Sequence, residues 1–273
     1  MCELFGMSAH HAATVQLSLE AFSRHGSKRG LNKDGWGIAL YRGLDLLLVK
    51  EPAPAENSEV VRFIESHDLA SPLVMSHIRH ATAGDLSYAN THPFSRELGG
   101  RMHAFAHNGD LTGFSSAELP RRTGAQFQPI GETDSEFLFC ELLLLLAPLW
   151  SRGQPPSLRE RYDTIARFAA AARERGMVNF FYGDGQALFV HSDYREAETG
   201  AGRLPGLFVL SRTCPACEAG FECAGLALQP GSEGQLVQTV SLVASVPLSD
   251  ENWRPLADGE LVVLVDGVVV DPC

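Results

Sequence analysis

The sequence predicts an α+β fold, because strand-like segments cluster toward both ends of the chain while two helical segments lie together in its middle. The helical patterns cover residues 133–146 and 157–175. Blocks of this kind favour separate layers of helices and sheets over an alternating parallel sheet. No internal repeat and no low-complexity linker divides the chain. We therefore expect residues 1–273 to form a single domain.

The pattern of the first part of the chain predicts several strands and a hairpin, with one helix before the hairpin and one after it. Residues 2–9 alternate enough for a strand, and apolar residues at helical spacing predict a helix over residues 11–25. A glycine-rich loop leads into WGIALYRG, which forms a predicted hairpin with LDLLLVKEP across a short turn. Beyond it the pattern predicts a helix over residues 56–67 and strands over residues 73–81 and 102–111.

The two central helices carry recognisable ends. The first begins with Thr133 or Asp134 as its N-cap and has Glu136 in its first turn. The second is rich in alanine and ends at Gly176. The remaining segments are typical of strands, two of them with an Asp-Gly hairpin turn: VNFFYGDGQALFVHSD, GLFVLSRT, QTVSLVASVPL and ELVVLVDGVVVD.

Composition and charge restrict the class of protein. Hydrophobic residues make up 45% and charged residues 20% of the 273 residues, as in ordinary globular proteins. The formal net charge is −11, without a basic run, so neither nucleic acid nor an anionic membrane surface is an expected partner. The longest apolar stretch, residues 142–150, is far shorter than the roughly 20 residues that span a bilayer. Six cysteines and no secretory signal favour a cytoplasmic location.

The second residue is the strongest catalytic candidate. If the small Cys2 side chain allows Met1 to be removed, the mature chain begins with a thiol and a free α-amine on one residue. Such an amine has a pKa of ~7.7–8.0 and a thiol a pKa of ~8.5, so the amine can accept the thiol proton at working pH. This is the N-terminal form of a nucleophile with its own base. The alternative is that Cys2 is simply a small buried side chain.

Three further stretches offer groups that would hold an amino acid substrate. HIRHATAG places Arg79 at the end of a strand, and a guanidinium grips a carboxylate in two places. AHNGDL places the Asn108 amide beside the Gly109 backbone N–H, a natural pair of donors for an oxyanion. GETDSE places Asp134 at a helix start, where a carboxylate would bind an ammonium group. Taken singly, these residues fit a surface ion pair, a turn and a helix cap equally well.

These motifs together resemble a known family. MCELFGMSA, KDGWGIALY, HIRHATAG, NTHPF, AHNGDL and GETDSE, in this order, are similar to the class II glutamine amidotransferase domain, particularly its small stand-alone bacterial members. The resemblance covers residues 1–140 and continues more weakly through residues 243–264. It implies an N-terminal-nucleophile hydrolase fold, a four-layer αββα sandwich of two antiparallel sheets.

The resemblance also implies a role for each candidate residue. Cys2 would attack the side-chain carbonyl of glutamine and form a γ-glutamyl thioester, which water hydrolyses to glutamate. Asn108 and Gly109 would stabilise the oxyanion. Arg79 would hold the substrate carboxylate, and Asp134 its α-amino group.

Histidines and cysteines could instead suggest a metal site. His77, His80, His103 and His107 lie near the proposed pocket, but His77 and His80 are three apart on a strand and point to opposite faces. We assign His80 to the wall of the substrate site. Cys214, Cys217 and Cys223 supply only one C-x₂-C pair, whereas a zinc site needs four ligands. We therefore expect no metal and no other cofactor.

The sequence leaves three functions open. The first is hydrolysis of glutamine to glutamate and ammonia, and the second is cleavage of a γ-glutamyl amide or peptide. The third is a regulatory binding module with an idle nucleophile. No segment resembles a fused synthase or a phosphate-binding glycine loop, so a separate ammonia-accepting synthase is a possible partner. A homo-oligomer also remains open.

Overall fold

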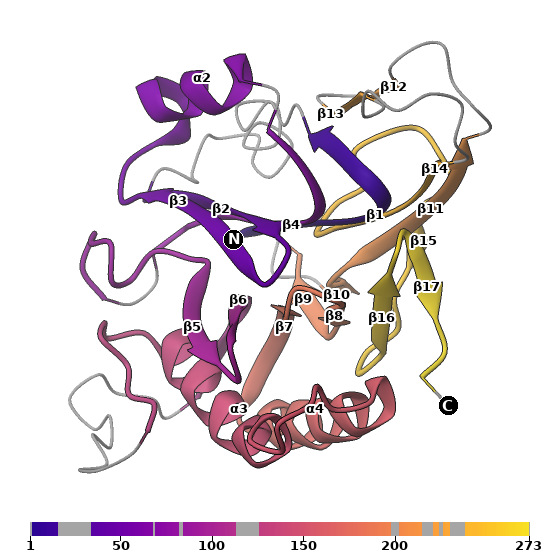
Figure 1. Cartoon of the computed structure of the whole chain (residues 1–273). Coiled ribbons are helices and arrows are strands. Elements are labelled where there is room, and N and C mark those ends of the chain that lie inside the picture. The colour runs from indigo at the N-terminus through magenta and orange to yellow at the C-terminus, as the bar shows by residue number, and fades with distance from the viewer. Residues whose placement is uncertain are drawn as a thin grey trace.

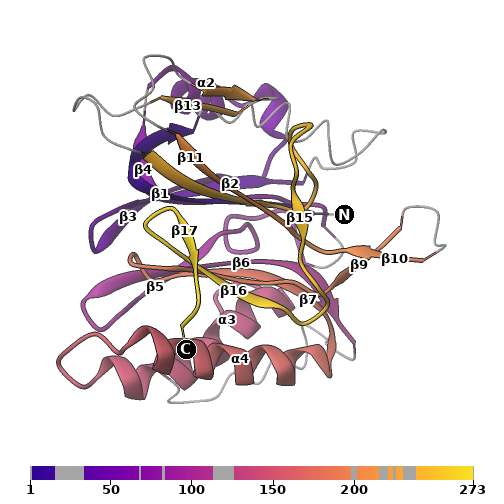
Figure 2. The ribbon, with the colours of Figure 1, turned by 90° about the vertical axis from the view of Figure 1, so that its right-hand side faces the viewer.

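The computed structural model describes residues 2–15, 34–67, 69–81, 84–112, 126–197, 202–214, 221–223, 226–229 and 238–272. Two β-sheets stack face to face, and helices cover their outer faces (Figures 1 and 2). All strand pairs in the described part of the chain are antiparallel. This arrangement is the αββα sandwich that the resemblance implied.

The first sheet contains the N-terminal strand at its centre. Its strands follow the order β15-β11-β14-β1-β4-β2-β3, and β13 pairs with both β1 and β12. Their bounds are β1 (Glu3–Val15), β2 (Trp36–Arg42), β3 (Asp45–Glu51), β4 (Ala70–Ile78), β11 (Phe208–Cys214), β12 (Phe221–Cys223), β13 (Leu226–Gln229), β14 (Gln238–Ala244) and β15 (Arg254–Pro255). Because β1 lies between β4 and β14, the start of the chain is fixed on both sides.

The second sheet has the order β17-β16-β8-β7-β6-β5. Its strands are β5 (Phe94–Leu98), β6 (Arg101–Leu111), β7 (Gly176–Gly183), β8 (Leu188–His191), β16 (Leu261–Val265) and β17 (Val268–Val270). A separate small hairpin consists of β9 (Tyr194–Glu196) and β10 (Arg203–Pro205). The strands β6 and β7 are neighbours in this sheet, and their register places Asn108 of β6 opposite Asn179 of β7.

Helices close the two outer faces. A short 3-10 turn, η1 (Ala55–Asn57), and α2 (Glu59–Ser66) lie against the first sheet, and α3 (Asp134–Trp150) and α4 (Leu158–Arg173) lie against the second (Figure 2). Buried apolar residues accordingly form three clusters, one between the sheets and one beneath each helical layer. Burial of these clusters supplies the main driving force for the fold.

The helix ends follow local hydrogen-bonding rules. Thr133, and not Asp134, is the N-cap of α3, because its side chain accepts a hydrogen bond from the N–H of Glu136 at 3.2 Å. Ser157 and Glu160 form a reciprocal capping box at the start of α4. Both helices therefore begin where side-chain oxygens satisfy the first free N–H groups.

The N-terminal strand is longer than the sequence pattern predicts. The predicted strand over residues 2–9 continues to Val15, so the predicted helix over residues 11–25 is wrong for residues 11–15. Past an irregularity between Ser8 and Ala13, the chain pairs again with β4 and also with β13. Here the hydrogen bonds to neighbouring strands override the preference for a helix that the spacing of the apolar residues indicates. The remainder of the predicted helix, residues 16–25, lies outside the described residues.

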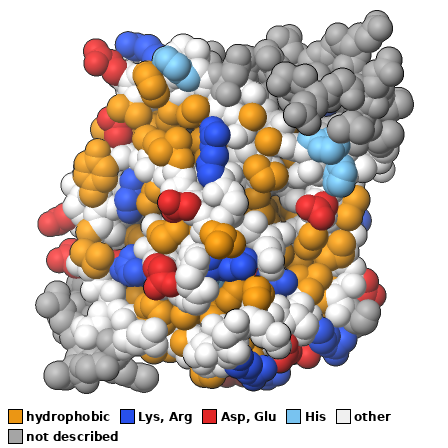
Figure 3. Space-filling view, viewed as in Figure 1, with side chains coloured by type: hydrophobic (Ala, Val, Ile, Leu, Met, Phe, Trp, Pro, Cys, Tyr) orange, Lys and Arg blue, Asp and Glu red, His pale blue; other side chains and the backbone are white. Residues whose placement is uncertain are grey.

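The surface carries both signs of charge. On the face shown in Figure 3, lysine and arginine side chains alternate with acidic ones among hydrophobic side chains, without a single-sign stripe. Within the described residues, no helix is long and apolar enough to cross a membrane.

Candidate active site

Cys2 lies immediately before β1, beside the end of β4. The backbone N–H of His80 donates to the Cys2 Sγ at 3.1 Å, and the thiol donates to the His80 carbonyl at 3.3 Å. The pairing of Glu3 with Ile78 brings these two segments together. The sulfur is therefore positioned by the backbone that follows β4.

The surroundings of Cys2 favour its protonated form. Burial raises the pKa of the Cys2 thiol, while the His80 backbone N–H and the positive charge of Arg79 act in the opposite direction. The net shift is upward, so the thiolate is scarce at neutral pH. A nucleophile with a raised pKa needs a base beside it. Met1, whose removal would free the Cys2 amine for that purpose, lies outside the described residues.

Asn108 reaches Cys2 from the opposite sheet. Its Nδ2 donates to the Cys2 carbonyl oxygen at 2.7 Å, which fixes the amide beside the nucleophile. The side chain of Asn179 supports this strand position, because its Nδ2 donates to the Asn108 carbonyl at 3.3 Å and to the Tyr194 carbonyl at 2.9 Å. Sequence reasoning missed Asn179, since only the register of β6 with β7 reveals it.

Gly109 occupies a place where no other residue fits. A Cβ at this position would lie 1.9 Å from the Met177 carbonyl oxygen and 2.6 Å from Nε2 of His107. The strand β6 therefore approaches β7 as closely as glycine allows. This close approach fixes the backbone next to Asn108.

Gly109→Ala is therefore expected to destabilise the protein by about 1–3 kcal/mol, since β6 must move away from β7 to accept the methyl group. The same movement displaces Asn108, so the turnover of any reaction at Cys2 should also fall. Chemical unfolding and initial-rate measurements check both effects. Gly100→Ala, just before the other end of β6, is the control. Gly100 has a φ of +80°, so alanine there also costs stability, but its Cβ would meet open space and turnover should stay unchanged. Equal turnover in both variants would contradict this role of the close approach.

Arg79 follows β4 and is buried beneath the loop that comes after it. Its Nη1 donates to the Asp85 carbonyl at 3.2 Å and its Nη2 to the Gly84 carbonyl at 3.3 Å. Its backbone N–H donates to the Gly35 carbonyl at 2.8 Å. The guanidinium is thus held near Cys2, where its positive charge partly offsets the upward shift that burial gives the thiol pKa.

His80 contributes its backbone to Cys2 and its ring to a different contact. The ring Nδ1 lies 3.6 Å from Oδ2 of Asp34, and the same carboxylate oxygen accepts from the N–H of Ala81 at 2.8 Å. Asp34 therefore holds the segment that cradles the sulfur. The ring is about one-third exposed.

Asp134 is connected to the site through β6. Its Oδ2 accepts from the N–H of Leu111 at 3.0 Å, and its Oδ1 accepts from the N–H of Ser135 at 2.7 Å. The Ser135 hydroxyl also donates to Oδ1, at 3.3 Å. The structure thus brings Cys2 together with Arg79, His80 and Asn108, and attaches Asp134 to the strand that carries Asn108.

Three histidines are buried near this site. The rings of His77 and His92 are tilted by 38° to each other, with centroids 4.2 Å apart, and Nδ1 of His107 lies 2.9 Å from the Ser135 hydroxyl. Burial lowers the pKa of His77 to about 3 and that of His92 well below its ordinary value. These rings are therefore neutral at pH 7. In the described part of the chain, no cluster of His, Cys, Asp and Glu is arranged to hold a metal ion.

The free energy of unfolding should therefore fall as the pH is lowered from about 6.5 toward 4. A histidine with a lowered pKa binds a proton more readily in the unfolded chain, and each contributes a slope of about 1.4 kcal/mol per pH unit. His77→Phe removes one such histidine, so the dependence of the unfolding free energy on pH should decrease by about 1.4 kcal/mol per pH unit. Urea unfolding at several pH values measures it, with the exposed His67→Gln as control. A His77→Phe slope identical to that of the parent would contradict the assignment.

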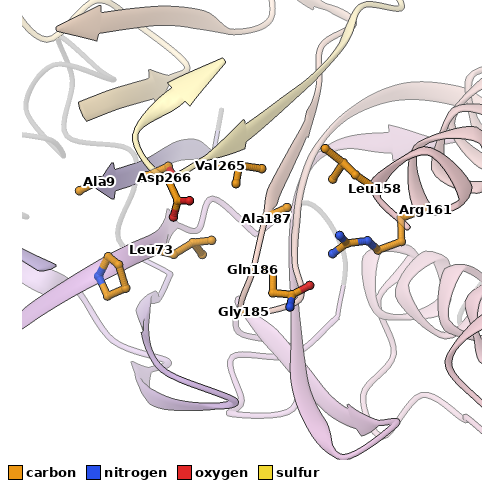
Figure 4. Close-up of a pocket in the computed structure, with 11 residues that line it drawn as sticks. Ala9, Leu73, Leu158, Arg161, Gly185, Gln186, Ala187, Val265 and Asp266 are labelled. Atoms are coloured by element: carbon orange, nitrogen blue, oxygen red, sulfur yellow. The ribbon is translucent and has the colours of Figure 1, made fainter. Parts of the chain in front are cut away.

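A separate cavity lies beside the middle of β1. It has a volume of about 460 Å³ and lies between the two sheets and α4, with Ser8, Leu73, Arg161, Gln186 and Asp266 in its lining (Figure 4). Ser8 lies six positions after Cys2 along the extended chain, a distance of about 20 Å. This cavity is therefore not part of the site around Cys2. The side chains of Cys214, Cys217 and Cys223 lie outside the described residues.

Comparison with known proteins agrees with this geometry. The family described as "Glutamine amidotransferases class-II" matches residues 1–272. The chain is 34% identical over 261 residues to the Escherichia coli (strain K12) protein named "Putative glutamine amidotransferase YafJ", covering 95% of this chain and 96% of that protein. It is 33% identical over 270 residues to protein MJ1515 of Methanocaldococcus jannaschii, covering 99% of this chain and 71% of that protein.

Solved structures give the same result. A crystal structure titled as a predicted glutamine amidotransferase from Pseudomonas aeruginosa PA01 superposes with a TM-score of 0.69 at 30% identity, covering 99% of this chain and 100% of that one. The glutamine phosphoribosylpyrophosphate amidotransferase of Bacillus subtilis shares the fold, with a TM-score of 0.58 at 19% identity over 98% of this chain and 48% of that one. The chain belongs to the class II glutamine amidotransferases.

Proposed function

We propose that the chain hydrolyses the side-chain amide of glutamine and releases glutamate and ammonia. The observation that supports this most strongly is the position of the Cys2 sulfur on the His80 N–H, with the Asn108 amide bound to the carbonyl of the same cysteine. A nucleophile and an oxyanion donor therefore converge from two different sheets. We propose that residues 1–273 perform this reaction as a single domain.

The proposed reaction has two halves. The Cys2 sulfur attacks the γ-carbonyl carbon while the Cys2 amine takes the thiol proton. The tetrahedral intermediate then expels ammonia, which receives that proton, and a γ-glutamyl thioester remains. Water attacks the thioester, the proton returns to sulfur, and glutamate leaves. Because burial raises the pKa of Cys2, the amine is the group that makes the attack possible at neutral pH.

The remaining residues bind the substrate and its developing charge. Asn108 Nδ2 has two N–H groups, and only one is needed for the Cys2 carbonyl. The other, with the Gly109 backbone N–H, stabilises the oxyanion. Arg79 holds the α-carboxylate and Asp134 the α-ammonium group, while His80 forms part of the wall. No metal or other cofactor takes part in this scheme.

The second candidate is hydrolysis of a γ-glutamyl amide or peptide, and exposed apolar side chains favour it. Leu86, Tyr88 and Ile130 are 57%, 60% and 71% exposed. They lie on the two loops that also contact Arg79 and precede Asp134. A substrate with a larger leaving group would find apolar contacts there. In the first candidate, ammonia would pass to a separate synthase in the cytoplasm.

A substrate panel tests the proposal. The chain from which Met1 has been removed is incubated in turn with glutamine, γ-glutamyl amides and γ-glutamyl peptides. Glutamate release is measured, with Cys2→Ala as control. Fastest release from glutamine supports the first candidate, and preference for a γ-glutamyl peptide supports the second. Release that is unchanged in Cys2→Ala overturns the role of Cys2 as the nucleophile. No release from any substrate overturns both candidates and leaves a binding module.

A further inference from the structure

Asn90 lies between the two halves of the proposed substrate site and contacts both of them. Its side chain is buried, and its Nδ2 donates to the Asp85 carbonyl at 3.0 Å. Its Oδ1 accepts from the backbone N–H of Glu132 at 2.8 Å. One amide therefore joins the loop after β4 to the segment before α3, two segments separated by more than forty residues.

Glycine on each side lets both segments press against this amide. A Cβ on Gly84 would lie 2.8 Å from Asn90 Nδ2, and a Cβ on Gly131 would lie 2.2 Å from Asn90 Oδ1. Neither distance is compatible with a larger residue. The Asn90 amide is thus packed between two backbones at the closest approach that the chain permits.

Each of these backbones carries one of the proposed substrate-binding groups. The Asp85 carbonyl that accepts from Asn90 also accepts from the Arg79 guanidinium at 3.2 Å. The Glu132 N–H that donates to Asn90 comes one residue before the N-cap of α3 and two before Asp134. The Asn90 amide therefore connects the carboxylate-binding side of the site to the ammonium-binding side.

We propose that Asn90 is a positioning residue that sets the distance between Arg79 and Asp134, and thereby selects substrates that carry both an α-carboxylate and an α-ammonium group. Asn90 does not need to touch the substrate. This inference rests on the proposed function. The binding of a substrate that contacts both Arg79 and Asp134 depends on the distance between them. The binding of a substrate that is held only by its carboxylate does not.

The test compares two substrates in two variants. Glutamine is compared with glutaramate, which has the same amide and carboxylate but lacks the α-amino group. Asn90→Ala should raise the KM for glutamine about 10-fold or more and change the KM for glutaramate by less than about threefold. Asn90→Asp fills the same space but places a carboxylate oxygen against the Asp85 carbonyl, so it should give the same pattern if Asn90→Ala does not fold.

Thr91→Val is the matched control. Its hydroxyl donates to the Ser87 carbonyl at 2.8 Å within the same loop and does not reach the segment before α3. It should change the KM of both substrates by a similar factor. Equal losses for glutamine and glutaramate in the Asn90 variants, with an active parent, overturn the inference alone. A parent that releases no glutamate from glutamine overturns the proposed function and the inference with it.

Discussion

Asn108→Ala is expected to lower the turnover number for glutamine hydrolysis by about 10²–10³, because it removes one of the two oxyanion donors that we propose. The donor is preorganised in the resting protein, where its Nδ2 already lies 2.7 Å from the Cys2 carbonyl. No reorganisation is then required when negative charge develops on the substrate. The expected loss is in kcat, since the oxyanion forms only after binding. Initial rates over a range of glutamine concentrations measure it.

Folding must be separated from catalysis in this variant. Asn108 is buried, so its removal also costs the hydrogen bond to Cys2, about 1–3 kcal/mol for a buried acceptor left without a donor. Thermal unfolding of Asn108→Ala reports this cost directly. Asn108→Asp is the matched variant, because it keeps the shape but replaces the donor by a negative acceptor, and its turnover should be at least as low. Turnover near the parent value in either folded variant would rule out the oxyanion role.

A chain whose Cys2 amine is blocked should lose about 10²–10⁴ in turnover, the usual contribution of a positioned general base. The block is an N-terminal extension that ends in a cleavage site for a specific protease, so that cleavage leaves Cys2 as the first residue. Burial already raises the pKa of the Cys2 thiol, and without its amine the sulfur remains protonated at neutral pH. Cleavage should restore turnover, with mass spectrometry confirming the new N-terminus.

The pH dependence of the blocked chain gives an independent check. Its residual activity should rise with pH, because deprotonation of a thiol with a raised pKa then depends on solvent hydroxide. The cleaved chain should reach its full activity at lower pH. A blocked chain as active as the cleaved one would show that another group accepts the proton.

Local chemistry in the sequence determined many of the elements. The alternation and the short turn of residues 36–51 specify the hairpin β2–β3, whose register pairs Trp36 with Glu51. The capping box of Ser157 and Glu160 starts α4 at the predicted place. The motifs around Cys2, Arg79, Asn108 and Asp134 identified the family through their order along the chain. All of these signals depend on residues close together in sequence, where spacing and propensity are informative.

The contacts between those elements were decided by the tertiary structure alone. The continuation of β1 to Val15 depends on pairing with β4 and β13, which overrode a helical spacing. The contact of Asn108 with Cys2 joins two sheets. The contact of Asn179 with Asn108 follows from the register of β6 with β7. The contact of Asn90 with Glu132, on which its proposed role depends, follows from the meeting of two segments far apart in the chain. Such contacts join residues far apart in the chain, and long-range strand pairing and burial, which leave no periodic mark in the sequence, bring them together.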